Sequence, residues 1–289
     1  MAGPVHKAIR DAARILATSG VAGARLDAEV LAAHALGRER LALLSDPPDR
    51  FDGAAKVRFD TAVAARAAGV PVAYLTGSRE FYGLEFAVGP GVLIPRPDSE
   101  TLVEAVLAAV PALAPARRGA LRILDLGVGS GCLLLSLLHA LPAANGVGVD
   151  ICPVALACAQ GNARRLGLAA RARFLLGDWW AALDGTESAF DIVIANPPYI
   201  LRAAIAALAP AVRDYEPHLA LDGGDDGLDA YRAIMDGLPL WLASPGIAAI
   251  EIGHDQAPAV MALMAPGARA QWSVRQDLAG RDRVLCWVR

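Results

Sequence analysis

Short apolar strands alternate with helices from residue 98 to the end of the sequence, and this alternation constrains the fold more than any other feature. Helices are predicted at 98–110, 132–141, 153–166, 228–242 and 256–264, and strands at 121–126, 146–151, 173–176, 191–195, 246–252, 271–276 and 283–288. Strands alternating with helices predict a doubly wound, mainly parallel α/β sheet. Only a short turn separates the last two strands, so we expect the final strand to run antiparallel.

The first 97 residues have a different character. Residues 1–70 are rich in Ala and Leu at helical spacing and show no strand pattern, which predicts a small all-α bundle. Residues 71–97 contain short alternating segments separated by glycines, which predicts a β-hairpin linker. The chain is therefore expected to contain a helical part, a linker and an α/β part at 98–289.

Charge and cysteine content argue against several classes of protein. The formal net charge is −3 and no segment carries a block of like charge, which argues against a nucleic-acid-binding protein. The four cysteines form no C-x-x-C pair, so neither a metal site nor a disulfide framework is predicted. No signal-peptide pattern is present, and the uncharged run at 126–149 contains Pro142 and glycines, unlike a membrane span. We expect a cytoplasmic protein without a membrane segment.

A glycine-rich loop follows the first strand of the predicted sheet and opens a helix. It reads Asp125-Leu126-Gly127-Val128-Gly129-Ser130-Gly131. Such a loop lets the backbone approach a ligand closely and exposes N–H groups at the helix N-terminus. The spacing is neither the dinucleotide G-x-G-x-x-G nor a P-loop. A nucleoside-like ligand without phosphate is therefore favoured, with Asp125, Gly127, Val128, Gly129, Ser130 and Gly131 as candidate binding residues.

Acidic and aromatic side chains follow the next two strands. Asp150 ends the second strand, where a carboxylate can accept hydrogen bonds from both hydroxyls of a ribose. Asp178 and Trp179 follow the third strand, where either side chain could hold a purine. Packing of the tryptophan in the core is an equally good interpretation of Trp179. All these residues are expected at the carboxyl edge of the sheet, where α/β folds bind ligands.

The strand at 191–195 ends in Asn196-Pro197-Pro198-Tyr199. Each proline fixes its own φ and holds the residue before it extended, so the turn is rigid. It presents one amide side chain, one proline carbonyl and one aromatic ring, which suits a flat polar group. An ordinary strand end followed by a Pro-Pro loop is the alternative for this tetrapeptide alone.

Together, the glycine loop, the acidic residue after the second strand and N-P-P-Y after the fourth resemble the class I S-adenosylmethionine-dependent methyltransferases. The resemblance implies a Rossmann-like, seven-stranded sheet, S-adenosylmethionine as cofactor and methylation of a nitrogen conjugated to a π system. An amide nitrogen is a poor nucleophile because its lone pair is delocalised. The Asn196 side-chain oxygen and the Pro197 carbonyl can each accept one N–H of such a nitrogen, and Tyr199 can pack on the planar group. Asn196 is expected to contact both cofactor and substrate.

The linker and the C-terminal half resemble the peptide chain release factor glutamine methyltransferases. The matching segments are Tyr74-Leu75-Thr76-Gly77, Arg79-Glu80-Phe81-Tyr82-Gly83, Val92-Leu93-Ile94-Pro95-Arg96-Pro97, Glu216-Pro217, Asp226-Gly227-Leu228-Asp229, Glu251-Ile252-Gly253 and Asp282-Arg283-Val284. This resemblance implies methylation of the glutamine in the Gly-Gly-Gln motif of class I release factors. It also implies a helical N-terminal domain that helps to recognise the release factor. We expect Arg96, Asn196, Pro197, Pro198 and Tyr199 to contact that substrate, and the enzyme to be a monomer.

Three departures from the family pattern and three alternative functions accompany this interpretation. Asp98-Ser99-Glu100 replaces the usual Glu-Thr-Glu, Val128 replaces Thr, and Ala211 replaces a frequent Glu. The nearest alternative is a ribosomal-protein glutamine methyltransferase, although its linker tends to read P-R-S-P. A DNA adenine methyltransferase would need a basic, aromatic-lined surface. A non-catalytic cofactor-binding module would not need an intact N-P-P-Y.

Overall fold

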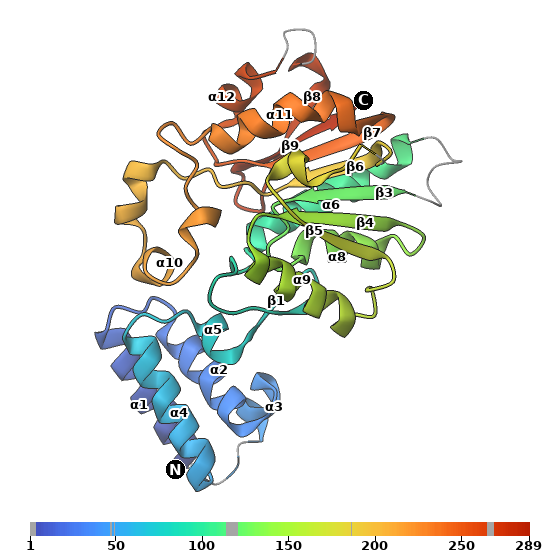
Figure 1. Cartoon of the computed structure of the whole chain (residues 1–289). Helices are drawn as coiled ribbons and strands as arrows, with labels where there is room; N and C mark the ends of the chain where they lie inside the picture. Colours follow the sequence, from blue (N-terminus) through green and yellow to red (C-terminus); the bar gives the residue numbers. More distant parts are fainter. Residues whose placement is uncertain (1–3, 47, 49, 114–120, 186, 265–268) are drawn as a thin grey trace. The chain divides into compact units, whose positions relative to one another are not determined.

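The computed structural model describes residues 4–46, 48, 50–113, 121–185, 187–264 and 269–289 (Figure 1). The chain divides into two compact units. Unit 1 spans Met1–Ser78 together with Ala209–Tyr215, and unit 2 spans Arg79–Leu208 and Glu216–Arg289. No helix in the described residues has the length and apolar character needed to cross a membrane.

A seven-stranded sheet forms the centre of unit 2. Its strands are β3 (Arg122–Leu126), β4 (Asn145–Asp150), β5 (Ala172–Leu176), β6 (Phe190–Ala195), β7 (Leu242–Glu251), β8 (Trp272–Gln276) and β9 (Asp282–Val288). Their order in the sheet is β5-β4-β3-β6-β7-β9-β8. The first five strands pair in parallel, whereas β9 pairs antiparallel with both β7 and β8. The predicted mainly parallel sheet with an antiparallel last strand is confirmed.

The central strand β6 shows why the sheet needs helices on both faces. All six of its residues are buried, as expected for a short β-branched run between two layers. Ile192 and Ile194 belong to one core, with buried residues of the helices α6 (Glu100–Ala109) and α8 (Cys132–Ala140). Val193 and Ala195 belong to a second core, with residues of α11 (Asp229–Trp241) and α12 (Ala257–Ala262). Figure 1 shows α11 and α8 on opposite sides of the sheet.

The helices of unit 2 follow the predicted alternation. They are α6 (Glu100–Ala109), α8 (Cys132–Ala140), α9 (Pro153–Arg165), α11 (Asp229–Trp241) and α12 (Ala257–Ala262). A 3₁₀ turn, η1 (Pro97–Ser99), leads into α6. Ser99 occupies the position before α6, but its side chain makes no capping hydrogen bond. The Ser99 hydroxyl is therefore available to bond groups outside α6.

A hairpin of β1 (Ser78–Phe81) and β2 (Leu84–Ala87) precedes the α/β part. Its two turn residues, Tyr82 and Gly83, have φ of 51° and 73°, as a type I′ turn requires. The predicted hairpin is present, but it does not fill the whole linker. Val72–Thr76 forms the short helix α5, which ends at Gly77 in the left-handed conformation. The glycine expected to separate two strands instead ends a helix.

Unit 1 is built from helices around one apolar core. Besides α5, the helices are α1 (Pro4–Thr18), α2 (Ala24–Leu36), α3 (Arg40–Ser45), α4 (Gly53–Ala67) and α10 (Pro210–Arg213). The core contains Ile9, Leu31 and Phe59. An ion pair joins Arg66 Nε to Asp27 Oδ2 at 2.7 Å between α4 and α2. The later segment of this unit is attached through Tyr215, whose hydroxyl donates to the Ala68 carbonyl at 3.1 Å.

Candidate active site

A cavity of about 420 Å³ lies at the carboxyl ends of the parallel strands of unit 2. It is found where the strand order reverses, because the chain moves outward from β3 to β4 and β5 and then returns to β6 beside β3. Ligands of open α/β sheets bind at such switch points. The volume falls in the range of about 300–1,000 Å³ that is typical of small-molecule sites. Of the predicted site residues, the cavity is lined by Arg96, Gly127, Val128, Gly129, Ser130, Asp150, Asp178, Trp179, Asn196 and Pro198.

The glycine loop forms one wall of the cavity. The N–H groups of Gly127 and Val128 both donate to the Val149 carbonyl at 2.9 Å, which ties the loop to the end of β4. Gly127 and Gly129 have φ of 76° and 56°, a region that favours glycine. A Cβ on Gly129 would meet no atom within 4 Å, so the loop backbone borders open space. Gly131 also has a positive φ but does not line the cavity.

Asp150 holds the loop that follows β3 and the loop that follows β4 in place. Its Oδ2 accepts the Gly129 N–H at 2.8 Å and its Oδ1 accepts the Cys152 N–H at 2.9 Å. Burial raises the pKa of this carboxyl above its usual value, while the backbone donors oppose that shift. An ionised carboxylate has about four acceptor sites, so two remain for a ligand. The predicted role in binding two hydroxyls is compatible with these bonds.

Asp125 lies beneath the cavity rather than on its wall. The residue is 1% exposed, and neither carboxylate oxygen has a hydrogen-bond partner among the described residues. Burial raises the pKa of Asp125 to about 8, and the nearby charge of Asp150 adds to the effect. Burial therefore favours the protonated form of this carboxyl, and Asp125 is not among the residues that line the cavity.

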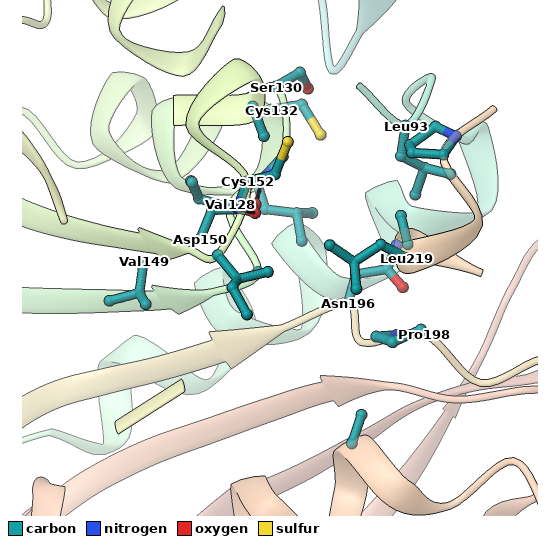
Figure 2. Close-up of a pocket in the computed structure, with 18 of the residues that line it drawn as sticks. Leu93, Val128, Ser130, Cys132, Val149, Asp150, Cys152, Asn196, Pro198 and Leu219 are labelled. Atoms are coloured by element: carbon teal, nitrogen blue, oxygen red, sulfur yellow. Dashed lines mark hydrogen bonds between the residues drawn. The ribbon is translucent and has the colours of Figure 1, made fainter. Parts of the chain in front are cut away.

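Asn196 and Pro198 form the wall opposite the glycine loop. Figure 2 shows both residues across the cavity from Val128 and Asp150. The Asn196 Nδ2 lies 3.3 Å from the hydroxyl of Ser99. Pro197 and Tyr199, which are also predicted site residues, do not line the cavity.

Tyr199 packs against the core that contains α11, and its main chain is fixed from behind. The Gln256 Nε2 donates to the Tyr199 carbonyl at 3.1 Å. A Cβ on Gly227 would lie 2.7 Å from the same carbonyl oxygen, so only glycine allows this approach. Burial raises the pKa of the Tyr199 phenol to about 12, so it stays neutral at physiological pH. The N-P-P-Y turn is held by neighbours as well as by its prolines.

Arg96 links the linker to the segment after N-P-P-Y. Its Nη2 lies 2.5 Å from Glu216 Oε1, and the Ile94 N–H donates to Glu216 Oε2 at 3.1 Å. The Glu216 side chain is only 2% exposed, whereas that of Arg96 is 35% exposed. The guanidinium is thus anchored on one side and remains accessible on the cavity side.

Trp179 lies at the cavity wall and also touches the core. Its φ is 44°, an uncommon value for a residue with a side chain, and such strain clusters at functional sites. A Cβ on Gly127 would be 3.8 Å from the Trp179 ring, so the indole lies beside the glycine loop. The ring also packs against the core around α11. Asp178 lines the same wall and is exposed.

The sequence did not single out several side chains that hold this site together. Asn162 on α9 is fully buried and joins the hairpin to the glycine loop. It accepts the Ala87 N–H at 2.8 Å and donates to the Ser130 carbonyl at 2.9 Å. Cys132 lines the cavity, and burial raises the pKa of its thiol to about 12, so it is no nucleophile. The only sequence signal for Asn162 was its place on a predicted helix.

The chain matches two family models, the PrmC N-terminal domain over residues 7–77 and a methyltransferase domain over residues 118–223. A release factor glutamine methyltransferase of Moorella thermoacetica is 48% identical over 280 residues, covering 96% of each chain. A protein of the same name from Cereibacter sphaeroides is 44% identical over 278 residues, again 96% of each. The solved N-terminal domain of human METTL16 shares the fold, with 18% identity, a TM-score of 0.52 and coverage of 80% of this chain and 83% of that one. This chain belongs to the release factor glutamine methyltransferase family.

Proposed function

We propose that this protein transfers a methyl group from S-adenosylmethionine to the side-chain amide nitrogen of the glutamine in the Gly-Gly-Gln motif of class I release factors. The observation that carries the proposal is the position of Asn196. A carboxamide on a rigid strand end faces a glycine loop across a cavity large enough for a nucleoside. The full-length similarity to release factor glutamine methyltransferases narrows the acceptor to a glutamine.

The cavity residues fit the methyl donor of this family. Asp150 keeps acceptor sites for two ribose hydroxyls, and the open backbone at Gly129 allows close approach of a ligand. Val149, Ile151 and the Trp179 ring supply apolar surface for an adenine. When bound, S-adenosylmethionine supplies an electrophilic methyl group.

The residues opposite the glycine loop would orient the acceptor. The Asn196 Oδ1 and the Pro197 carbonyl each accept one N–H of the glutamine amide, which fixes the plane of that group. Acceptors placed in this way favour the positive charge that develops on nitrogen during transfer. Tyr199 is a neutral phenol, so it acts through packing and not as a base. The proton leaves the nitrogen after transfer, and most of the rate enhancement comes from positioning.

The helical unit 1 would help to recognise the release factor, as expected from the family. Its residues 7–77 match the PrmC N-terminal domain, which is a module separate from the methyltransferase domain. The net charge of −3 gives no support to a nucleic-acid substrate. We further propose that the enzyme acts as a monomer on a protein substrate.

The test is mass spectrometry of purified release factor incubated with the enzyme and labelled S-adenosylmethionine. We expect one added methyl group on the glutamine of the Gly-Gly-Gln motif. Asn196→Ala should reduce the rate by roughly 10²–10³-fold, the loss typical of removing one oriented polar group in an active site.

Asn145→Ala is the matched control, because Asn145 is exposed at the start of β4, at the opposite end of that strand from Asp150. This variant should retain the wild-type rate. Label on a ribosomal protein or on DNA in place of the release factor, or a full rate in Asn196→Ala, would overturn the proposal.

A further inference from the structure

Ser99 is a buried hydroxyl that does not serve the helix it precedes. It stands before α6, a position where serine normally caps the helix, yet it makes no capping bond. The residue is 2% exposed. Its Oγ lies 3.3 Å from Asn196 Nδ2, and its hydroxyl also acts on the Glu251 carboxyl as a donor that lowers the pKa of that group. Ser99 therefore bridges an acidic residue and the proposed substrate-orienting amide.

Glu251 lies at the end of β7, beside the end of β6. Ala195 is in register with Ile250, so the next residues, Asn196 and Glu251, follow on neighbouring strands. Glu251 is 2% exposed, and its Oε2 has no hydrogen-bond partner among the described residues. The Glu251 carboxyl is therefore buried, and one of its oxygens has no partner among the described residues.

Charged and titratable groups surround Glu251 from several elements. They are Arg283 on β9, Asp98 in η1, Arg96 in the linker, Tyr199 after β6, Tyr231 on α11 and Cys132 on α8. Arg283 is itself paired with Asp277, at 3.1 Å. The positive charges of Arg283 and Arg96 favour the ionised form of Glu251, and the negative charge of Asp98 opposes it.

The number of protons in the bridge determines how Asn196 is oriented. An ionised Glu251 only accepts, so Ser99 must donate its single proton to that carboxylate. The Ser99 oxygen can then only accept from Asn196, which must present its Nδ2. The other half of the Asn196 carboxamide, Oδ1, is then left as an acceptor for the substrate. The reverse orientation would place N–H donors against the N–H groups of a substrate amide.

We propose that Ser99 and Glu251 are positioning residues that select the orientation of the Asn196 carboxamide in which Oδ1 faces the substrate nitrogen. This inference rests on the proposed function, because it assumes an acceptor that bears N–H groups. Neither residue touches the reacting atoms. Each acts through Asn196.

Protonation of Glu251 would release this selection. A protonated Glu251 carboxyl can donate to the Ser99 oxygen, which leaves the Ser99 proton free to be donated to Asn196. The Asn196 carboxamide can then turn its Oδ1 toward Ser99, which is the opposite orientation. Burial raises the pKa of Glu251 to about 7, against the Ser99 hydrogen bond and the Arg283 charge, which lower it. The productive orientation is therefore fixed above this pKa and is lost as the pH falls through it.

The experiment measures kcat and KM for methylation of purified release factor across neutral pH in wild type, Ser99→Ala, Ser99→Thr and Glu251→Gln. Binding of S-adenosylmethionine to each variant is measured by calorimetry, which also shows that the variant is folded. We expect a wild-type kcat that falls on the acid side of pH 7. Ser99→Ala should lower kcat about tenfold at high pH, with an unchanged cofactor affinity. Ser99→Thr keeps the hydroxyl and should restore most of the rate.

Glu251→Gln gives the sharpest readout. A glutamine can accept from Ser99 but does not titrate, so kcat should be below the wild-type plateau and nearly independent of pH. A purely structural role predicts a lower kcat with the wild-type acid limb intact, and that result would overturn the inference. So would a Ser99→Ala variant with wild-type kcat. Absence of methyl transfer by the wild type would instead sink the proposed function, so the two failures are distinguishable.

Discussion

Asp125 carries a carboxyl group that is shielded from solvent, and burial outweighs the Leu134 backbone N–H that favours its ionised form. Its folded-state pKa of about 8 is far above the ordinary 3.8. As the pH rises from 3.8 to about 8, the unfolded chain releases this proton while the folded chain retains it. The free energy of unfolding of the wild type therefore falls progressively as the pH rises across this window.

Replacing Asp125 with asparagine tests this account, because the amide cannot titrate. We expect the free energy of unfolding of Asp125→Asn to increase relative to that of the wild type as the pH rises from 3.8 to about 8, so the variant becomes relatively more stable. Urea unfolding of both proteins at several pH values measures the difference. A difference that stays constant across the window would contradict the assigned pKa.

Gly227 is required by its backbone and by its neighbours. Its φ is 73°, and a Cβ would lie 2.7 Å from the Tyr199 carbonyl oxygen and 2.8 Å from Gln256 Nε2. Gly227→Ala must therefore displace the N-P-P-Y turn, and we expect at least a tenfold loss of kcat with cofactor affinity retained. The measurement is methyl transfer alongside calorimetric binding of S-adenosylmethionine.

Gly161→Ala is the matched control for that substitution. Gly161 lies inside α9, and a Cβ there would meet no atom within 4 Å. Alanine should raise the free energy of unfolding by about 0.5–1 kcal/mol, because glycine weakens a helix interior. Equal losses of activity in the two variants would show that the Tyr199 contact is unimportant.

At the scale of elements, Asn162 joins three pieces of chain. It bonds the backbone of Ala87 in β2 through both its amide oxygen and its nitrogen, and it donates to Ser130 in the glycine loop. Asn162→Ala would remove these partners from the Ala87 N–H and from the buried Ser130 carbonyl, at a cost of about 1–3 kcal/mol for each group left unpaired. We expect a clear fall in the unfolding midpoint and weaker binding of S-adenosylmethionine. Asn145→Ala, at an exposed position, should leave both unchanged.

The elements themselves were largely predictable from local pattern. Ile192–Ile194 predicts a buried strand, and Pro197 and Pro198 end it, because period and backbone restriction act over a few residues. Helix α5 was missed because Val72–Thr76 is β-branched at both ends and short, and its Gly77 cap resembles a strand turn.

The bonds that complete the site were not predictable in this way. Ser99 meets Asn196 across 97 positions of sequence, and Asn162 meets Ala87 across 75. A single sequence contains no local signal for such pairs, since they arise only when the sheet and the helices have packed. The sequence therefore predicts the cavity walls, whereas the side chains that orient them come from the structure.

At the scale of the whole molecule, the chain passes between the two units at 78/79, at 208/209 and at 215/216. Residues Ala209–Tyr215 thus belong to unit 1 although they follow the N-P-P-Y turn. Their attachment includes the bond from the Tyr215 hydroxyl to Ala68 and the packing of the Tyr215 ring within 3.3 Å of a Cβ built on Gly69.

A single cut in the chain should therefore fail to release the helical unit. We expect that a protease site inserted at the exposed hairpin residue Gly83 yields two fragments that co-elute in size-exclusion chromatography and separate in urea. Tyr215→Ala should promote their separation, because it removes the bond to Ala68. Fragments of the wild-type sequence that separate without denaturant would contradict this expectation.

The return of Ala209–Tyr215 to unit 1 also has a consequence for chimaeras. Exchanging residues 1–78 with those of a homologue would place the homologue's helices beside the native segment Ala209–Tyr215, whose sequence matches the native helices and not the foreign ones. A functional graft must carry both pieces, although 130 residues of unit 2, Arg79–Leu208, separate them in the sequence. The helical unit is thus encoded by two distant stretches of the gene, which must change together.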